Sequence, residues 1–232
     1  MRLHKFFITQ KLNENVGKEI FITDSELIHQ WQKVFRFSSG ERIILLDNSG
    51  FEYLSEITLL TKKEAKVSII ESKENKNIPS KKLWVIQSLI KKDNFEWVIE
   101  KCTEVGVSDF VPLISDRSEK KDINMERARK IIKEASEQSG RGFMPELHEI
   151  IKIDDIVKYK IPIVAFHLEG EQFKKEDFEG NQEMIILIGP EGGWTEREIE
   201  LFKNNNVKIV CLGNCVLRAE TAAIVSSALL LL

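Results

Sequence analysis

MIILIGPEGGWTEREIE, residues 184–200, decides the fold, because it contains a strand, a loop and a helix start in direct succession. Its apolar run ends in the glycine-rich loop Gly189-Pro190-Glu191-Gly192-Gly193. Thr195 to Glu198 then match the S/T-x-x-E capping box, in which a hydroxyl and a carboxylate accept from free amides at a helix start. A near-continuous apolar strand that leads directly into a helix is typical of a parallel sheet covered on both faces.

The same alternation extends through the rest of the C-terminal part of the chain. Apolar strands are predicted at residues 83–90, 109–115, 161–168, 184–189 and 208–213. Helices are predicted at residues 94–106, 124–140, 195–205 and 219–232. Strands that alternate with helices predict an α/β fold built on a mostly parallel sheet.

The first 70 residues carry a different pattern, that of short strands separated by turns. Strands are predicted at residues 4–9, 17–23, 41–50, 51–60 and 64–70, and this spacing indicates a small β-barrel. One helix is predicted at residues 24–37, capped by Asp24. Its apolar face would consist of Leu27, Ile28, Trp31, Val34 and Phe35.

A polar, lysine-rich stretch separates the two patterns. It is broken by Pro79, which favours a domain boundary at this point. We therefore expect a barrel over residues 1–72, a linker over residues 73–82 and an α/β domain over residues 83–232.

Composition indicates a soluble globular protein. Hydrophobic residues make up 42% of the 232 residues and charged residues 31%, which is enough apolar material for a buried core. The N-terminus has no apolar core followed by a cleavage site. The apolar run 222–232 is shorter than the roughly 20 residues that span a bilayer. We expect a cytoplasmic protein without a membrane partner.

The three cysteines match neither a disulfide framework nor a zinc site. Cys211 and Cys215 have C-x3-C spacing, with neither a histidine nor a third cysteine nearby, and Cys102 stands alone. We expect buried free thiols and no metal.

The net charge of −3 conceals an uneven distribution of charge. Residues 62–92 hold nine lysines against three glutamates, residues 117–141 hold eight lysines or arginines against five acids, and residues 168–200 hold ten acids against three bases. A polyanion responds to local potential rather than to net charge. The basic stretches are therefore either a nucleic-acid surface or solvated helix faces and a linker.

Two glycine loops follow predicted strands, namely residues 189–193 and Gly213-Asn214. Ligands of parallel sheets bind at such carboxyl ends. The loops lack the Lys-Ser/Thr pair of a P-loop and the G-x-G-x-x-G of a dinucleotide site, so a phosphate-rich ligand is disfavoured. Free amides here suit an adenine, a ribose or a carboxylate, although glycines at a strand-to-helix turn also serve structure alone.

Taken in order, the two loops resemble the last two signature motifs of SPOUT-class RNA methyltransferases. The motifs are LIGPEGGWTEREI (187–199) and CLGNCVLRAETAA (211–223). More closely, the chain is similar to the bacterial family that methylates N3 of a uridine in 16S ribosomal RNA. Four further blocks in the same order carry this resemblance: MRLHKFF, HQWQKVFRFSSGERI, KKDNFEWVIEKCTEVGVSDFVPLISDRS and EASEQSGRGFMPEL. Trp194, where phenylalanine is expected, and Ala219, where threonine is common, are slight departures.

The resemblance implies a PUA-like N-terminal barrel that contacts RNA, and a C-terminal α/β domain with a deep trefoil knot at about residues 163–232. It also implies a homodimer, with the apolar residues 222–232 at its interface, in the core, or both. S-adenosyl-L-methionine (SAM) would be the cofactor, and S-adenosylhomocysteine its product. The implied cofactor contacts are Leu168, Gly189, Pro190, Glu191, Gly192, Gly193, Leu212, Gly213, Val216 and Leu217.

Uridine N3 carries a proton, so the implied reaction must remove that proton or stabilise the resulting imidate. No metal is needed for this step. Arg218, directly after the second glycine loop, is the first candidate for the stabilising cation; alternatively, it forms an ion pair with Glu220 that braces the fold. Glu191 either faces the cofactor or caps the helix that follows it.

Gln138 and Arg141, at the end of the helix predicted over residues 124–140, are candidates to orient the uracil edge or a phosphate. Arg141 alternatively supplies positive charge to a helix C-terminus. The candidate RNA contacts are Arg2, Lys5, Arg36, Arg117 and Lys120, together with the basic stripe 127–133.

Three functions are compatible with these residues. The first is methylation of uridine N3 in the 16S RNA of the small ribosomal subunit, and the second is methylation of another RNA on the same fold. The third is RNA binding or ribosome assembly without catalysis. The intact loop 189–193, with Arg218 and Glu220, favours a catalyst over the third function.

Overall fold

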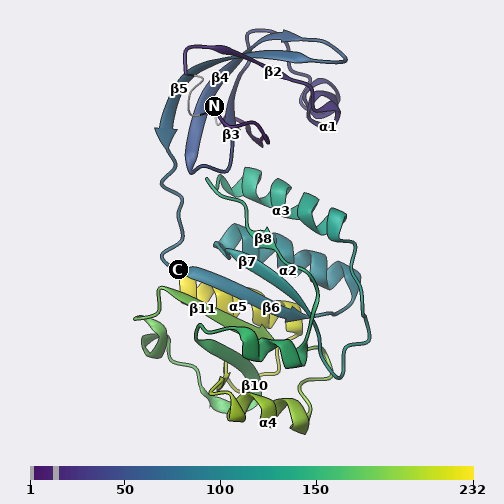
Figure 1. Cartoon of the computed structure of the whole chain (residues 1–232), viewed down its shortest axis with the longest axis vertical. Helices are drawn as coiled ribbons and strands as arrows, with labels where there is room; N and C mark the ends of the chain where they lie inside the picture. The colour runs from purple at the N-terminus through teal and green to yellow at the C-terminus, as the bar shows by residue number, and fades with distance from the viewer. Residues whose placement is uncertain (1–2, 13–15) are drawn as a thin grey trace. The chain divides into compact units, whose positions relative to one another are not determined.

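The protein, seen here as a computed structural model, is described over residues 3–12 and 16–232. It divides into two compact units (Figure 1). The first comprises the chain up to Ile78 together with Glu137–Phe143, and the second comprises Pro79–Ser136 and Met144–Leu232. Arg2, one of the predicted RNA contacts, lies outside the described residues.

The first unit is built on a five-stranded sheet that curls into a half-barrel. Its strands are β1 (Lys5–Phe7), β2 (Glu19–Ile22), β3 (Arg42–Leu46), β4 (Phe51–Leu60) and β5 (Ala65–Glu74). They are ordered β1-β3-β4-β5-β2, with β1 and β3 parallel and the other neighbours antiparallel. Among the described residues the edge strands β1 and β2 do not pair, so the sheet is open where the strand spacing predicts a closed barrel.

A helical segment packs against this sheet. α1 (Ser25–His29) begins at Asp24, whose carboxylate accepts hydrogen bonds from two amides of the first turn, at 2.9 and 3.1 Å. The predicted cap is confirmed. Trp31, which follows the helix, is fully buried in the core of the sheet. The segment thus covers apolar surface that an open sheet would otherwise expose to water.

The end of this helical segment departs from the prediction. Gln30–Val34 forms a π-helical turn, η1, in which the Phe35 amide donates to the Gln30 carbonyl five residues earlier. The extra residue in the turn changes which side chains face the sheet. Val34 is 66% exposed, so its predicted place on the apolar face is wrong.

Residues 137–143 pack with the first unit through buried hydrogen bonds. The Asn75 side-chain amide donates to the Glu52 carboxylate and to the Gly140 carbonyl, each at 2.9 Å. Lys5, a predicted RNA contact, pairs with the same Glu52 carboxylate and is largely buried. The ammonium group of Lys5 therefore has a structural partner within this unit.

The second unit is built on a seven-stranded sheet in which every neighbouring pair is parallel, so the predicted mostly parallel sheet is confirmed. The order is β12-β10-β11-β6-β7-β8, and β9 also pairs with β7. Two of the strands, β8 and β9, have only two residues each and were not predicted. The strands are β6 (Lys82–Ser88), β7 (Asp109–Ile114), β8 (Glu146–Leu147), β9 (Ile151–Lys152), β10 (Ile163–Gln172), β11 (Glu183–Ile188) and β12 (Lys208–Cys211).

Side chains of these strands alternate between two cores, as a sheet buried on both faces requires. In β11, Ile186 lies in one cluster with residues of α2, α3 and α5. Its neighbours Ile185 and Leu187 lie in the other cluster, with residues of α4 and the 3-10 helix η2. Helices therefore cover both faces of the sheet (Figure 1). The helices are α2 (Lys92–Val105), α3 (Met125–Ser139), η2 (Ile153–Lys158), η3 (Lys175–Phe178), α4 (Glu196–Asn204) and α5 (Ala219–Leu231).

β10 is longer than predicted and contains an irregularity that shapes one edge of the sheet. Its pairing with β12 shifts register between Phe166 and Glu171. At Gly170 a β-carbon would lie 2.5–2.7 Å from the Val210 backbone, so glycine is needed for β12 to approach this closely. Leu168 lies within the irregular segment and is exposed.

The burial of the cysteines is only partly as expected. Cys102 is fully buried, and burial raises the pKa of its thiol to about 12. Cys211 is half-buried and Cys215 is exposed, so the expectation of buried thiols is wrong for Cys215. All three are free thiols.

The C-terminal helix α5 is strongly apolar and packs on one side only. Ala223 and Leu230 are buried in the core of the second unit, whereas Leu229 is exposed.

Of the helices in residues 3–12 and 16–232, none combines the length and the apolar character needed to cross a membrane.

Candidate active site

A cavity of about 330 Å³ lies at the carboxyl ends of β11 and β12, beside residues 166–168 within β10. β10 lies between β11 and β12, so the loops that follow these two strands meet beside the point where the pairing of β10 becomes irregular. Phe166 comes from β10, Ile188 ends β11, and Leu212 follows β12. Most of the lining is apolar side chain or glycine backbone, which suits the uncharged parts of a small organic ligand.

The loops bring together most of the predicted cofactor contacts. Nine of the ten predicted residues line the cavity, and Gly192 does not. The candidate catalytic residues Glu191 and Arg218 line it as well. The nine are Leu168, Gly189, Pro190, Glu191, Gly193, Leu212, Gly213, Val216 and Leu217.

The first glycine loop is a tight turn held against β10 by an aromatic side chain. Gly193 has a φ of +67°, and its amide donates to the Pro190 carbonyl at 2.9 Å. A β-carbon at Gly189 would lie 3.1 Å from the Trp194 ring, so the indole packs directly on the bare backbone. The indole is buried, and its Nε1 donates to the Phe166 carbonyl at 3.1 Å. Trp194 therefore ties the loop to β10.

The helix behind this loop begins with the predicted capping box, which is confirmed. Thr195 Oγ1 accepts from the Glu198 amide at 3.3 Å, and Glu198 Oε2 accepts from the Thr195 amide at 2.7 Å. Glu198 is fully buried, and its Oε1 accepts from the Asp116 amide at 2.9 Å. Two donors of Arg197 meet the Asp116 carboxylate at 2.7 and 2.9 Å and lower its pKa. The loop after β7 is thereby fastened to α4.

Arg218 lies beside the cavity at the start of α5. It is the N-cap residue of this helix, and its side chain makes no capping hydrogen bond. The side chain is exposed and lines the cavity. Within the described residues no ion pair joins Arg218 to Glu220, which is 2% exposed and whose Oε2 has no hydrogen-bond partner there. Within the described residues, no contact therefore supports the alternative that Arg218 braces the fold through an ion pair with Glu220.

Gln138 and Arg141 belong to a different unit from the cavity. Both lie in residues 137–143, which pack with the first unit, and neither is among the described residues that line the cavity. Gln138 is exposed. Arg141 is only 6% exposed, and burial lowers the pKa of its guanidinium to about 10, so it stays protonated at neutral pH.

The remaining predicted RNA contacts differ in their surroundings. Arg36 and Lys120 are exposed. Arg36 has a φ of 55°, a left-handed conformation that is uncommon for a residue other than glycine. Arg117 is also exposed, but it donates to the carbonyls of Gly192 and Trp194 at 2.7 and 3.3 Å.

Several residues that line the cavity were not identified from the sequence. They include Phe166 and His167 in β10, Trp194 after the glycine loop, and Cys211 and Cys215 around the second loop. Strand ends beside a predicted glycine loop are a usable signal, because neighbouring parallel strands end at the same edge. A single sequence does not show the order of strands in the sheet. It therefore does not show that β10, rather than another strand, lies beside the two glycine loops.

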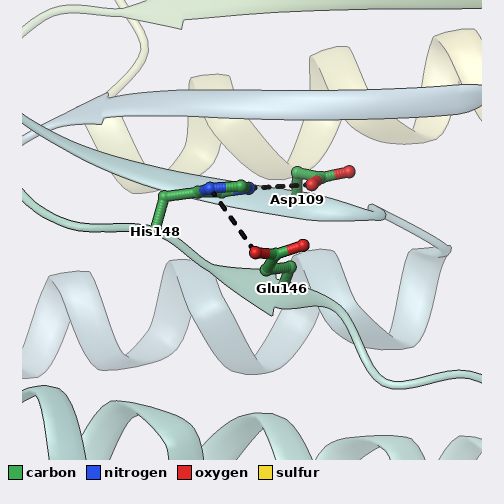
Figure 2. Close-up of side chains that lie close together, drawn as sticks. All are labelled: Asp109, Glu146 and His148. Atoms are coloured by element: carbon green, nitrogen blue, oxygen red, sulfur yellow. Dashed lines mark hydrogen bonds and ion pairs between the residues drawn. The ribbon is translucent and has the colours of Figure 1, made fainter.

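Asp109, Glu146 and His148 form a second group of ionisable side chains, around the first residue of β7 (Figure 2). Figure 2 shows the His148 ring between two carboxylates: Nε2 lies 2.8 Å from Asp109 Oδ1, and Nδ1 lies 3.8 Å from Glu146 Oε1. The two carboxylates thus contact different ring nitrogens, and one ligand atom from each of the three side chains lies within 4.8 Å of the other two. Lys82 Nζ, 3.6 Å from the other Asp109 oxygen, adds a competing cation.

Burial raises the pKa of Asp109, and the His148 hydrogen bond and the Lys82 charge oppose that rise. Because Asp109 and Lys82 begin their strands, this group lies at the amino ends of β6 and β7, away from the edge that holds the cavity. Its geometry favours a structural hydrogen-bond network over a metal site.

Two family models match the chain. The RNA methyltransferase PUA domain matches residues 32–70, and the RNA methyltransferase domain matches residues 76–231. A ribosomal RNA small subunit methyltransferase E from Rickettsia conorii is 29% identical, over 98% of this chain and 95% of its own length.

Two solved structures that contain SAM are similar to the whole chain. A methyltransferase from Legionella pneumophila, in complex with SAM, has a TM-score of 0.88 at 27% identity and covers 99% of this chain and 97% of its own. A ribosomal RNA small subunit methyltransferase E from Neisseria gonorrhoeae, bound to SAM, has a TM-score of 0.87 at 26% identity. It covers 98% of this chain and 96% of its own.

Proposed function

We propose that this chain, which belongs to the ribosomal RNA small subunit methyltransferase E family, transfers the methyl group of SAM to N3 of a uridine in 16S ribosomal RNA. The observation that carries the proposal is the cavity at the ends of β11 and β12, beside residues 166–168 of β10. The two glycine loops that line this cavity resemble motifs of SAM-dependent methyltransferases. The two solved structures described above, which are similar to the whole chain, contain SAM. S-adenosylhomocysteine is the second product.

The residues around the cavity fit this cofactor. Glycine at 189 and 193 allows the tight turn that places the loop backbone at the cavity, since a β-carbon at Gly189 would meet the Trp194 ring and Gly193 has a φ of +67°. Apolar residues such as Leu212 and Val216 suit the adenine ring. SAM has no phosphate, which agrees with the absence of a P-loop lysine. The bound cofactor supplies a methyl group activated by a positively charged sulfur.

Arg218 is the proposed catalytic cation. Uridine N3 must lose its proton before its lone pair can form the new N–C bond, and negative charge then spreads to the flanking carbonyl oxygens. A guanidinium at the wall of the cavity can donate to one of these oxygens and stabilise the imidate. Arg218 is suited to this because no capping bond or ion pair with Glu220 holds it elsewhere within the described residues.

Glu191 is assigned to the cofactor side of the loop. It lines the cavity, and the cap of α4 is made by Thr195 and Glu198 instead.

For the RNA, the exposed cations Arg36 and Lys120 are proposed phosphate contacts, which position the substrate and make binding weaker at high salt. Gln138 and Arg141 remain proposed RNA contacts, either to the uracil edge or to a phosphate.

We further propose that the protein is a cytoplasmic homodimer. Val216 beside the cavity is 77% exposed, and Leu229 and Leu232 of the C-terminal segment are exposed as well. A second copy of the chain would cover these apolar side chains. Sedimentation equilibrium is expected to give twice the chain mass, and a monomer at micromolar concentration would contradict the dimer.

A deep trefoil knot at about residues 163–232 is also proposed. It is supported by the resemblance of residues 187–199 and 211–223 to the two loop motifs of knotted methyltransferases. The position of β10 between the later strands β11 and β12 is compatible with it. A crystal structure whose C-terminal segment passes through no loop of the chain would contradict the knot.

Calorimetric titration with SAM tests the cofactor site. The purified protein is expected to bind SAM in a saturable manner. ATP is the matched control, because it shares the adenosine but carries phosphates that no lysine of the loops can neutralise. We expect ATP to bind at least about a hundredfold more weakly, roughly 2.7 kcal/mol. No heat with SAM, or equal affinity for the two ligands, would favour a non-catalytic RNA-binding protein.

A further inference from the structure

Arg117 holds the outer side of the glycine loop, on the side away from the cofactor cavity. Its Nη1 donates to the Gly192 carbonyl at 2.7 Å and to the Trp194 carbonyl at 3.3 Å. Gly189, Pro190 and Trp194 line the cavity, whereas neither Gly192 nor Arg117 does. One side of the loop therefore lines the cavity, and the other side is hydrogen-bonded to this arginine.

Gly192 faces the Arg117 side chain and does not line the cofactor cavity. A β-carbon at Gly192 would lie 3.4 Å from Arg117 Cδ and 3.5 Å from its Cβ, so the arginine stem packs directly on the glycine backbone. Charge-assisted bonds to two carbonyls of one turn restrict how that turn can move.

The position of Arg117 is itself fixed by its neighbour. Asp116 is bound by two donors of Arg197 and by the Thr195 hydroxyl, and its amide donates to the buried Glu198 carboxylate. The backbone from which Arg117 extends is therefore anchored to the start of α4, the helix that follows the glycine loop. An anchored backbone next to Arg117 limits the positions that the guanidinium can reach.

The surroundings of Arg117 disfavour a role in RNA binding. The hollow that it borders also carries four glutamates, namely Glu169, Glu171, Glu196 and Glu200, alongside Lys203 and Lys208. Carboxylates next to an arginine repel RNA phosphates.

We propose that Arg117 is a positioning residue for the cofactor: it holds the Gly192 and Trp194 carbonyls so that the loop keeps the shape that receives SAM, without itself touching SAM. This inference rests on the proposed function, since it assumes that the cavity is the SAM site.

The test is the substitution Arg117→Met, which keeps an apolar stem against Gly192 and removes the donors together with the positive charge. Lys121→Ala removes one positive charge from the same loop and is the matched control. We expect Arg117→Met to raise the dissociation constant for SAM about tenfold, while Lys121→Ala changes it less than about twofold. Arg117→Lys retains one charged donor and should recover part of the affinity. The kcat at saturating SAM should stay within about twofold of wild type.

Two results would overturn the proposal. One is unchanged SAM affinity in Arg117→Met. The other is a loss of RNA affinity larger than that of Lys121→Ala with no change for SAM, which would make Arg117 an RNA contact. A general structural role predicts a lower melting temperature and no rescue by Arg117→Lys, and it too would contradict the proposal. Failure of the wild-type protein to bind SAM would instead refute the proposed function, so the two failures are distinguishable.

Discussion

Arg218→Ala is expected to lower kcat for RNA methylation by about a hundredfold to a thousandfold while leaving the dissociation constant for SAM within about tenfold. The reason is that Arg218 is proposed to act on charge that develops on uracil only as N3 loses its proton. The guanidinium lines the cavity from the start of α5. Single-turnover methylation with saturating SAM measures kcat separately from binding.

Arg218→Lys is the matched variant for this prediction. A lysine keeps the positive charge but not the planar, five-donor geometry of the guanidinium, so we expect activity between wild type and Arg218→Ala. Equal losses of SAM affinity and methyl transfer in Arg218→Ala would mean that the residue is structural. Full activity in Arg218→Ala would remove it from the mechanism altogether.

Trp194→Ala is expected to lower the free energy of unfolding by about 3–5 kcal/mol and the melting temperature by roughly 10 °C. The indole is 4% exposed and packs edge-on against Phe202, with ring centroids 5.0 Å apart. It also contacts Gly189 and donates to the Phe166 carbonyl. Loss of the ring leaves a void beside the glycine loop, so SAM affinity should fall as well. Urea unfolding and calorimetry measure the two effects.

Trp194→Phe separates packing from the hydrogen bond. A phenylalanine keeps an aromatic ring against Gly189 and Phe202 but leaves the Phe166 carbonyl without its donor. The expected cost is about 1 kcal/mol. If Trp194→Ala unfolds at the same urea concentration as wild type, the indole does not tie the loop to β10.

Most elements of the second unit could be predicted from the sequence, because strands buried on both faces are nearly uninterrupted apolar runs. Residues 184–188 are an example: the run reads as a strand, and Thr195 to Glu198 mark the next helix by their capping chemistry. Two-residue strands such as β8 carry no such pattern, because their pairing with β7 is decided by tertiary contacts. The π-helical turn after α1 was missed for a related reason: periodicity assumes the spacing of a regular helix.

The site was predictable only in part. Strand ends and glycine loops indicated residues 189–193 and 213–214, because bare backbone at a carboxyl edge has a recognisable sequence. The resemblance to the methyltransferase family implied Leu212, Val216 and Leu217. The contact of Arg117 with Gly192 joins residues 75 positions apart, and no local pattern encodes it. Lys5 looked like a surface cation but pairs with Glu52. Charge alone does not reveal which cations already have a partner in the fold.

Nucleoside analysis of 16S ribosomal RNA tests the central claim most directly. RNA from cells with and without the gene would be digested and its 3-methyluridine measured by mass spectrometry. We predict that 3-methyluridine disappears from 16S RNA when the gene is deleted, and that it returns with the wild-type gene but not with the Arg218→Ala gene. An unchanged amount of 3-methyluridine in the deletion strain would contradict the proposed reaction.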